Sequence, residues 1–155
     1  MNKIYSQILK KNMINVLKDV LIYIEKEGLK DGHHLYINFN TSDKKVKIPD
    51  WLKKKYPNEM TIVIQFEYWN FEIKKNLFKI TLSFNDIKAN LIIPFSSIIS
   101  FVDPKANFGL KLIDEKDLKK EIIKKTKKIK KENLNNVINF DQFKKLHPAF
   151  RNLKE

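Results

Sequence analysis

The first part of the chain carries apolar residues at the spacing of one helical face. They recur at steps of three and four residues, as in an amphipathic helix, at Ile8, Leu9, Met13, Val16, Leu17, Val20, Leu21 and Ile24. Gly28 follows this run, and glycine often ends a helix because it adopts positive φ without strain. The pattern predicts one helix over residues 4–27.

Three apolar residues of this helix, Ile14, Ile22 and Tyr23, lie off that stripe. They are either ordinary residues at the rim of the buried face or part of a second contact face used in dimerisation. The periodicity is compatible with both interpretations.

From residue 33 onward the apolar positions alternate, which is the period of a β-strand. Leu35, Ile37 and Phe39 predict a strand over residues 33–40, and the β-branched run from Thr61 to Phe66 predicts another. Pro49 opens a predicted helical turn that extends through Lys55. Further strands are predicted over residues 46–48, 68–73, 78–84, 89–93, 97–102 and 108–112. One helix followed by short strands predicts a mainly β fold, a small barrel or sandwich.

Two features interrupt the predicted strands. Asn85 and Asp86 separate two apolar runs, and both residue types tolerate the positive φ of a tight turn. Gln65 interrupts the run from Thr61 to Phe66. A glutamine in such a position is either tied into the fold by hydrogen bonds or turned toward a ligand.

Composition sets limits on the class of protein. A chain of 155 residues with 43% apolar content predicts one domain with a modest core. It contains no cysteine, which excludes disulfides and thiolate metal sites. The N-terminus lacks the apolar segment of a signal peptide, and no apolar run reaches the ~18 residues of a membrane span. We therefore expect a soluble protein of the cytoplasm.

The composition changes after residue 113. Residues 114–136 are rich in lysine and contain no aromatic residue, glycine or proline, which predicts a mostly disordered linker. Residues 137–145 combine apolar anchors, an acid and a basic end. A short apolar cluster beyond a flexible tether is typical of a docking peptide. The sequence thus predicts a folded domain over residues 1–113, the linker, and a docking segment with an extension over residues 137–155.

The net charge of +13 has two interpretations. It fits a nucleic-acid-binding protein or one that meets an acidic surface. It also fits a compositional bias, since Lys, Ile, Asn and Phe are abundant, and we favour this second interpretation.

Catalytic chemistry has little support in this sequence. An enzyme needs a placed acid, base, nucleophile or metal, and the chain has three His, no Cys and no glycine-rich phosphate loop. The neighbouring His33 and His34 are expected to point in opposite directions on a strand rather than share a metal. We expect no enzymatic activity, no cofactor and no metal.

A single-stranded nucleic-acid-binding barrel is the main alternative. Such barrels stack bases on aromatic side chains beside a basic groove. The residues that could serve in this way are Tyr68, Trp69, Phe71 and Phe78, with Lys74, Lys75 and Lys79. We expect any other contact with nucleic acid to be non-specific and salt-sensitive.

An ordered series of motifs resembles one known family. It runs through Gly32-His-His-Leu-Tyr-Ile-Asn-Phe39, Ile48-Pro-Asp-Trp-Leu52, Tyr56-Pro-Asn-Glu-Met-Thr-Ile-Val-Ile-Gln65, Tyr68-Trp69, Ile93-Pro-Phe95, Phe101-Val-Asp-Pro104 and Phe108-Gly109. The series resembles SspB, the adaptor of the ClpXP protease, in its alpha-proteobacterial form. The resemblance covers about residues 5–112 and resumes over residues 137–145.

The resemblance implies a fold and an activity. It implies an Sm-like, partly open barrel and a dimer built around the N-terminal helix. It also implies binding of the ssrA tag, which is added to stalled translation products, and tethering to the ClpX unfoldase.

The resemblance also suggests site residues. For the tag site we expect Gln65 as the polar contact, with apolar groove walls and rim from Ile64, Leu82, Phe84, Trp51 and Leu52. For ClpX docking we expect apolar anchors and charged contacts at Val137, Ile138, Phe140, Asp141, Phe143, Lys144 and Lys145.

The chain departs from the family pattern in three places. Relatives commonly carry a glycine pair where this chain has Asn85 and Asp86, and their linker is often acidic. They usually end near the position of Lys145, whereas this chain continues through residues 146–155.

Overall fold

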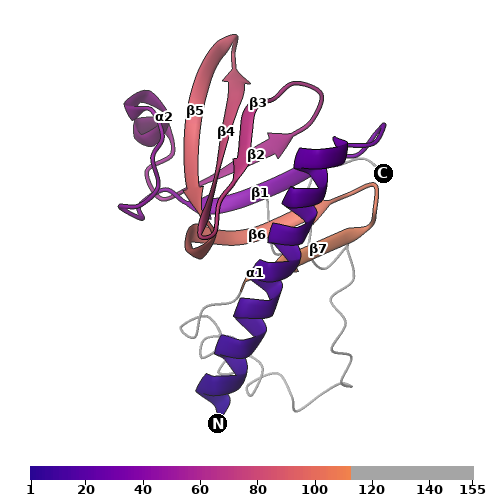
Figure 1. Cartoon of the computed structure of the whole chain (residues 1–155). Helices are drawn as coiled ribbons and strands as arrows, with labels where there is room; N and C mark the ends of the chain where they lie inside the picture. The colour runs from indigo at the N-terminus through magenta and orange to yellow at the C-terminus, as the bar shows by residue number, and fades with distance from the viewer. Residues whose placement is uncertain (113–155) are drawn as a thin grey trace, which may run out of the picture.

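A long N-terminal helix precedes seven strands in the computed structural model, which describes residues 1–112 (Figure 1). The elements are α1 (Asn2–Glu27), β1 (Leu35–Asn40), α2 (Asp50–Lys55), β2 (Glu59–Ile64), β3 (Trp69–Ile73), β4 (Leu77–Phe84), β5 (Ile87–Pro94), the short 3-10 helix η1 (Phe95–Ser97), β6 (Ile98–Asp103) and β7 (Phe108–Lys111). This order confirms the predicted mainly β class with one N-terminal helix.

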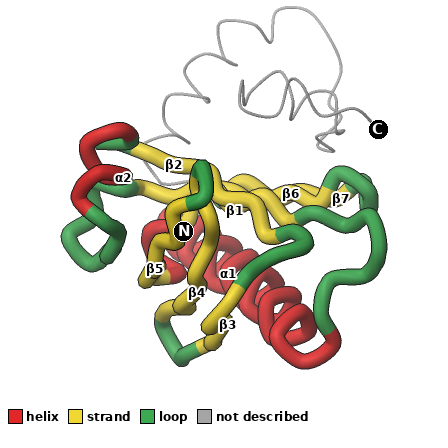
Figure 2. The backbone as a smooth tube through the Cα atoms, turned by 90° about the horizontal axis from the view of Figure 1, so that it is seen from above, coloured by secondary structure: helices red, strands yellow, loops and turns green. Residues whose placement is uncertain are grey.

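The strands form two antiparallel sheets rather than a closed barrel. One has the order β2-β1-β6-β7 and the other the order β3-β4-β5. β2 and β3 are consecutive in sequence but belong to different sheets, so the chain leaves one sheet and enters the other between Ile64 and Trp69. In Figures 1 and 2, α1 lies across the two sheets. The arrangement agrees with a partly open barrel.

The core lies between the inner faces of the two sheets and one face of α1. On β1, Leu35, Ile37 and Phe39 point inward, and their register partners on β2 are Ile64, Ile62 and Met60. Phe78, Ile80 and Leu82 project from β4 into the same core, as their shared face predicts. Burial of these side chains supplies the hydrophobic stabilisation of the domain.

Two local signals end elements as predicted. Gly28 has φ 72° and its N–H bonds to the carbonyl of Ile24, which ends α1. Asn85 (φ 50°) and Asp86 (φ 65°) both occupy the left-handed region. Positive φ at both central residues is the geometry of a two-residue hairpin turn whose twist matches that of the flanking strands. The β4–β5 hairpin therefore stays in register from Leu77 to Pro94.

One predicted strand is absent from the described residues, and another is shorter than predicted. Residues 46–48 do not form a strand, because only Lys47 pairs, exchanging two main-chain hydrogen bonds of 2.9 Å with Ile92. Pro49 follows closely and has no N–H with which to extend the ladder. β2 ends at Ile64 rather than at Phe66, because the chain turns away there toward the second sheet.

Buried hydroxyl groups of the four-stranded sheet differ in their hydrogen bonding. Thr41 is buried at the end of β1, and its Oγ1 donates to the carbonyl of Tyr56 (2.5 Å), which joins β1 to the end of α2. Ser100 Oγ is fully buried on β6 and, within residues 1–112, has no hydrogen-bond partner. The Oδ1 atom of Asn38, its register partner on β1, also has none.

Replacing each hydroxyl separates these two cases. We expect Thr41→Val to lower the free energy of unfolding by roughly 1–3 kcal/mol, because the Tyr56 carbonyl loses its donor inside the protein. We expect Ser100→Ala to leave that free energy unchanged or to raise it, because the Ser100 hydroxyl makes no hydrogen bond within the described domain that could be lost. Urea unfolding of both variants measures the difference, and equal losses would contradict it.

Candidate functional site

Three of the expected groove residues belong to the core. Ile64, Leu52 and Leu82 are buried in the cluster that joins the two sheets and α1. The structure places their side chains beneath the surface, so these three residues are part of the core and do not line the surface.

Trp51 and Phe84 come together at the surface. Their rings meet edge to face, with centroids 6.3 Å apart and an interplanar angle of 77°. Leu52 explains this placement, because its burial holds the short helix α2 against the core and leaves Trp51 40% exposed. The contact links α2 to the end of β4, next to the Asn85–Asp86 turn.

Gln65 lies at the other end of β2 from this aromatic pair. α2 leads through residues 56–58 into the start of β2, whereas Gln65 follows its last residue, Ile64. The Gln65 side chain is half-buried, and within residues 1–112 its amide has no hydrogen-bond partner. The sequence left two roles open for this glutamine, hydrogen bonding within the fold or contact with a ligand. Within the described residues, no hydrogen bond ties its amide into the fold.

The edge of β2 connects the two ends. Among the described strands, β2 pairs with β1 alone and forms one margin of its sheet. An edge strand presents main-chain N–H and C=O groups that an added strand can pair with. Six residues at ~3.3 Å each make this edge ~20 Å long.

Charges are unevenly distributed around this edge. Lys53, Lys54 and Lys55 are exposed on the last turn of α2, where positive charge interacts favourably with the helix dipole.

Two ionisable side chains of the neighbouring strands have shifted pKa values. On β3, a hydrogen bond from Lys74 lowers the pKa of Glu72. Burial raises the pKa of the Tyr36 phenol on β1.

The aromatic residues of the nucleic-acid alternative do not form a stacking platform. Phe78 is fully buried, and Tyr68 and Phe71 pack against the core. Trp69 lies on the outer side of β3, and Lys88 Nζ sits 3.9 Å from its ring centroid. The residues proposed for base stacking thus serve the core or are already covered.

The two adjacent histidines have different partners. His33 Nδ1 lies 2.7 Å from Asp103 Oδ2, and the ring of His34 meets Phe66. Within residues 1–112, no group of three or more His, Asp or Glu side chains is placed to hold a metal. No helix in the same part of the chain is long and apolar enough to cross a membrane.

The expected dimer residues on α1 are not equally accessible. Ile14 and Ile22 are half-buried, and Ile14 packs against the core, whereas Tyr23 is 49% exposed. The predicted main stripe is confirmed in its second half, where Met13, Val20 and the buried residues of α1 pack on the core, whereas Ile8, Leu9 and Val16 are exposed. The fully buried α1 residues are Leu17, Leu21 and Ile24.

An exposed apolar stripe on α1 was missed in the sequence. Tyr5, Leu9, Val16 and Tyr23 are all exposed and follow one another at intervals of four and seven residues. That spacing keeps them on one side of a helix. The spacing is visible in the sequence, but Leu9 and Val16 also fit the predicted main stripe. Only the packing of the sheets against α1 shows which apolar residues are buried and which are exposed.

The expected ClpX-docking residues, from Val137 to Lys145, lie outside the described residues, as does the linker over residues 114–136. Among the described residues, sequence reasoning also missed the contact between His34 and Phe66 beside Gln65.

Comparison with known proteins identifies the family. No curated protein sequence matches the chain. The family model for SspB, stringent starvation protein B, matches residues 7–148. This match covers both the described domain and most of the segment beyond it. The chain therefore belongs to the SspB family, a family of protease adaptors.

Proposed function

We propose that this chain is a non-enzymatic adaptor that delivers ssrA-tagged polypeptides to ClpX in the cytoplasm. Its folded domain binds the tag as an extended peptide, and residues 137–145 dock on ClpX. Family membership supports the adaptor role in general. The tag, the unfoldase and the residues that contact them are part of the proposal.

The free edge of β2 is the observation that carries the peptide-binding half. An extended peptide adds to such an edge through main-chain hydrogen bonds, while side-chain contacts supply specificity. Trp51 and Phe84 offer an apolar contact at one end, and Gln65 offers an unpaired amide at the other. The ~20 Å between the two ends fits about six residues of extended peptide.

Tethering explains how such an adaptor works without chemistry of its own. Two weak sites on one chain turn the second encounter into an intramolecular one, with effective concentrations in the ~mM range for short flexible linkers. Unfolding and ATP use then belong to the partner. The lysine-rich residues 114–136 act as the tether in this scheme.

A homodimer through α1 fits the same scheme. The exposed stripe of Tyr5, Leu9, Val16 and Tyr23 is unusual for a monomer, because contiguous apolar surface commonly marks an interface. Two such helices pack through residues that repeat every three and four positions. In this proposed interface Tyr23 is a contact residue, as expected from the sequence, whereas Ile14 packs against the core of its own protomer.

The first prediction for this function concerns Gln65. Gln65→Ala should weaken ssrA-peptide binding by roughly 1–3 kcal/mol, because the partner group on the peptide is left unpaired. Fluorescence anisotropy with a labelled ssrA peptide from the same source measures the loss. Gln7→Ala, the same change on an exposed part of α1, is the matched control. Normal binding by Gln65→Ala would show that Gln65 is not a tag contact.

The second prediction concerns α1. We expect the double variant Leu9→Lys, Val16→Lys to sediment as a monomer that still binds the peptide, because both side chains are exposed in the protomer. Gln7→Lys adds charge away from the stripe and should remain a dimer. Ile14→Lys should instead lower the free energy of unfolding. A double variant that remains a dimer would place the interface elsewhere.

The third prediction separates binding from delivery. Deleting residues 137–155 should leave peptide affinity unchanged but abolish faster ClpXP degradation of tagged substrate at low substrate concentration, where tethering matters most. Deleting only residues 146–155 tests the extension, and retained delivery would identify it as dispensable. Full delivery by the longer deletion would contradict the tethering mechanism.

A further inference from the structure

The face of the β2-β1-β6-β7 sheet that points away from the core, here called the outer face, is buried at its centre. Val102 and Ser100 on β6 are 0% exposed, and Asn38 on β1, the register partner of Ser100, is 8% exposed. Their neighbours Ile37 and Phe101 point into the core, so these three side chains point to the opposite side of the sheet. Such burial is unexpected for a surface that does not contribute to the core.

Within residues 1–112, no helix or second sheet lies over the outer face. Figure 2 shows α1 and the β3-β4-β5 sheet on the same side of the four-stranded sheet, where they enclose the core. The strand neighbours of Val102 give limited cover, because Gly109, its partner on β7, has no side chain. Its partner on β1, Tyr36, is itself half-buried, and burial raises the pKa of the Tyr36 phenol. The described elements therefore do not explain why the outer face is shielded.

The chain leaves the sheet beside this face. β7 ends at Lys111, the register partner of Ser100, and the Leu112 N–H donates to the carbonyl of Ile99 at 2.7 Å. Residues 113–155 therefore start at the edge of the outer face. As a flexible chain, residues 113–136 have an end-to-end distance of roughly 27 Å. This exceeds the width of four paired strands, which is about 14 Å, so the segment that follows can reach any part of the face.

Residues 137–145 have the composition that suits the outer face. Its centre combines the apolar Val102 with Asn38 Oδ1, a buried oxygen that has no hydrogen-bond partner within residues 1–112. A buried oxygen of this kind favours an occupant that brings N–H donors as well as apolar surface. Residues 137–145 bring both, in the run Val-Ile-Asn-Phe-Asp-Gln-Phe. The lysine-rich residues 114–136 bring mainly charge, which is costly to bury, and the extension is interrupted by Pro148, which lacks an N–H.

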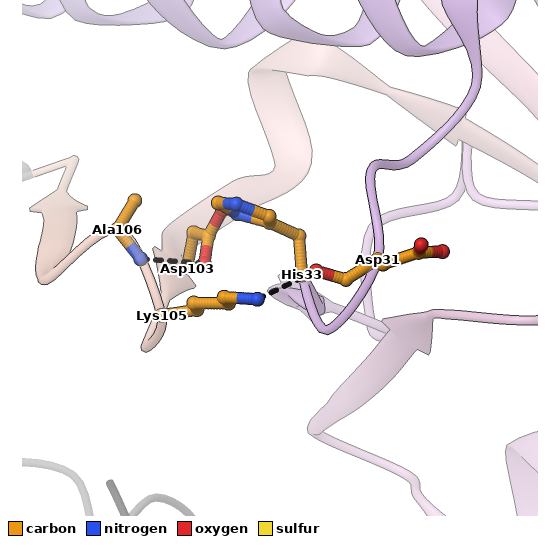
Figure 3. A network of polar contacts seen from close by, with 5 residues as sticks. All are labelled: Asp31, His33, Asp103, Lys105 and Ala106. Carbon is orange, nitrogen blue, oxygen red and sulfur yellow. Dashed lines mark hydrogen bonds and ion pairs between the residues drawn. The ribbon is translucent and has the colours of Figure 1, made fainter.

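One end of the outer face is held in place by polar contacts (Figure 3). Asp103 ends β6, and its Oδ2 lies 2.7 Å from His33 Nδ1, while its Oδ1 accepts a hydrogen bond from the Ala106 N–H at 3.0 Å. Lys105 Nζ donates to the carbonyl of Asp31 at 2.6 Å. These contacts join the start of β1 to the β6–β7 turn. A surface that is fixed before binding costs less entropy to occupy.

We propose that residues 137–145 pack on the outer face in the free protein and leave it to bind the unfoldase. The same segment then has two competing partners, its own sheet and ClpX. The contact lowers the apparent affinity for ClpX in proportion to the fraction of chains whose segment is bound to the sheet. Only this consequence rests on the proposed function, because the contact itself can be measured without ClpX.

A spin label tests the contact directly, since the chain contains no cysteine of its own. In the full-length protein, a nitroxide attached to Gln142→Cys should broaden the amide NMR signals of Tyr36, Asn38 and Val102 on the outer face. The signal of Ile87, at the start of β5 in the other sheet, should stay sharp. Broadening equal at all four positions, or at none, would contradict the contact.

Two further labelled proteins identify the occupant. Adding Phe140→Ser and Phe143→Ser should remove the broadening of the outer face, because both changes remove apolar side chains from the segment. Deleting residues 146–155 should leave the broadening unchanged. If it survives the two serine changes, another part of the chain covers the face and the proposal is wrong. If it appears only when spin-labelled protein is mixed with unlabelled, isotope-enriched protein, a second copy is the occupant.

ClpX affinity tests the consequence. Val102→Lys should displace the segment and bind ClpX about 3- to 10-fold more tightly, as expected if the segment is free in a tenth to a third of wild-type chains. Its affinity for the ssrA peptide should not change. Gln7→Lys adds the same charge on α1 and should bind ClpX like wild type. Circular dichroism establishes that Val102→Lys is folded, and if it is not, the spin-label result decides.

The proposal and the proposed function fail in distinguishable ways. Unchanged ClpX affinity in a folded Val102→Lys protein would show that the contact does not compete with docking. Wild type that shows the spin-label contact but does not bind ClpX would refute the docking role and leave the contact standing.

Discussion

The passage of the chain between two sheets that share one core is the constraint on which the structure depends. β2 and β3 are neighbours in sequence, but they belong to different sheets. The inward side chains of each strand reach the shared core from its own sheet. The four residues between them, 65–68, must turn away from the β1–β2 ladder. This turn leaves Gln65 without a partner among the described residues and exposes Phe66. The candidate site is a direct consequence of how the core is closed.

The same constraint leaves the edge of β2 open. A fully closed barrel would pair every strand on both sides, whereas here β2 has one described neighbour. An open edge favours aggregation unless it is used or protected. The Trp51–Phe84 pair at one end and Gln65 at the other flank this edge, which is compatible with the proposed binding of an extended peptide.

α1 divides its surface between two tasks. Leu17, Leu21 and Ile24 complete the core, while the stripe from Tyr5 to Tyr23 faces away from it. A helix with apolar residues on two sides requires a second surface to cover one of them. An adaptor that dimerises in this way would present two peptide sites and two tethers, which increases avidity for a multivalent partner.

The sequence alone determined the elements whose causes are local. The helix stop at Gly28, the turn at Asn85–Asp86 and the alternation of β1 depend on the conformations of single residues and their neighbours, and the ordered motifs indicated the family. Tertiary structure decided which apolar residues are core. Ile14 is inward and Leu9 outward, because the position of the sheets selects one face of a helix that is apolar on both. It also decided that β2 stops at Ile64 and that His34 meets Phe66, since both depend on strands that pair across the fold and not on adjacent residues.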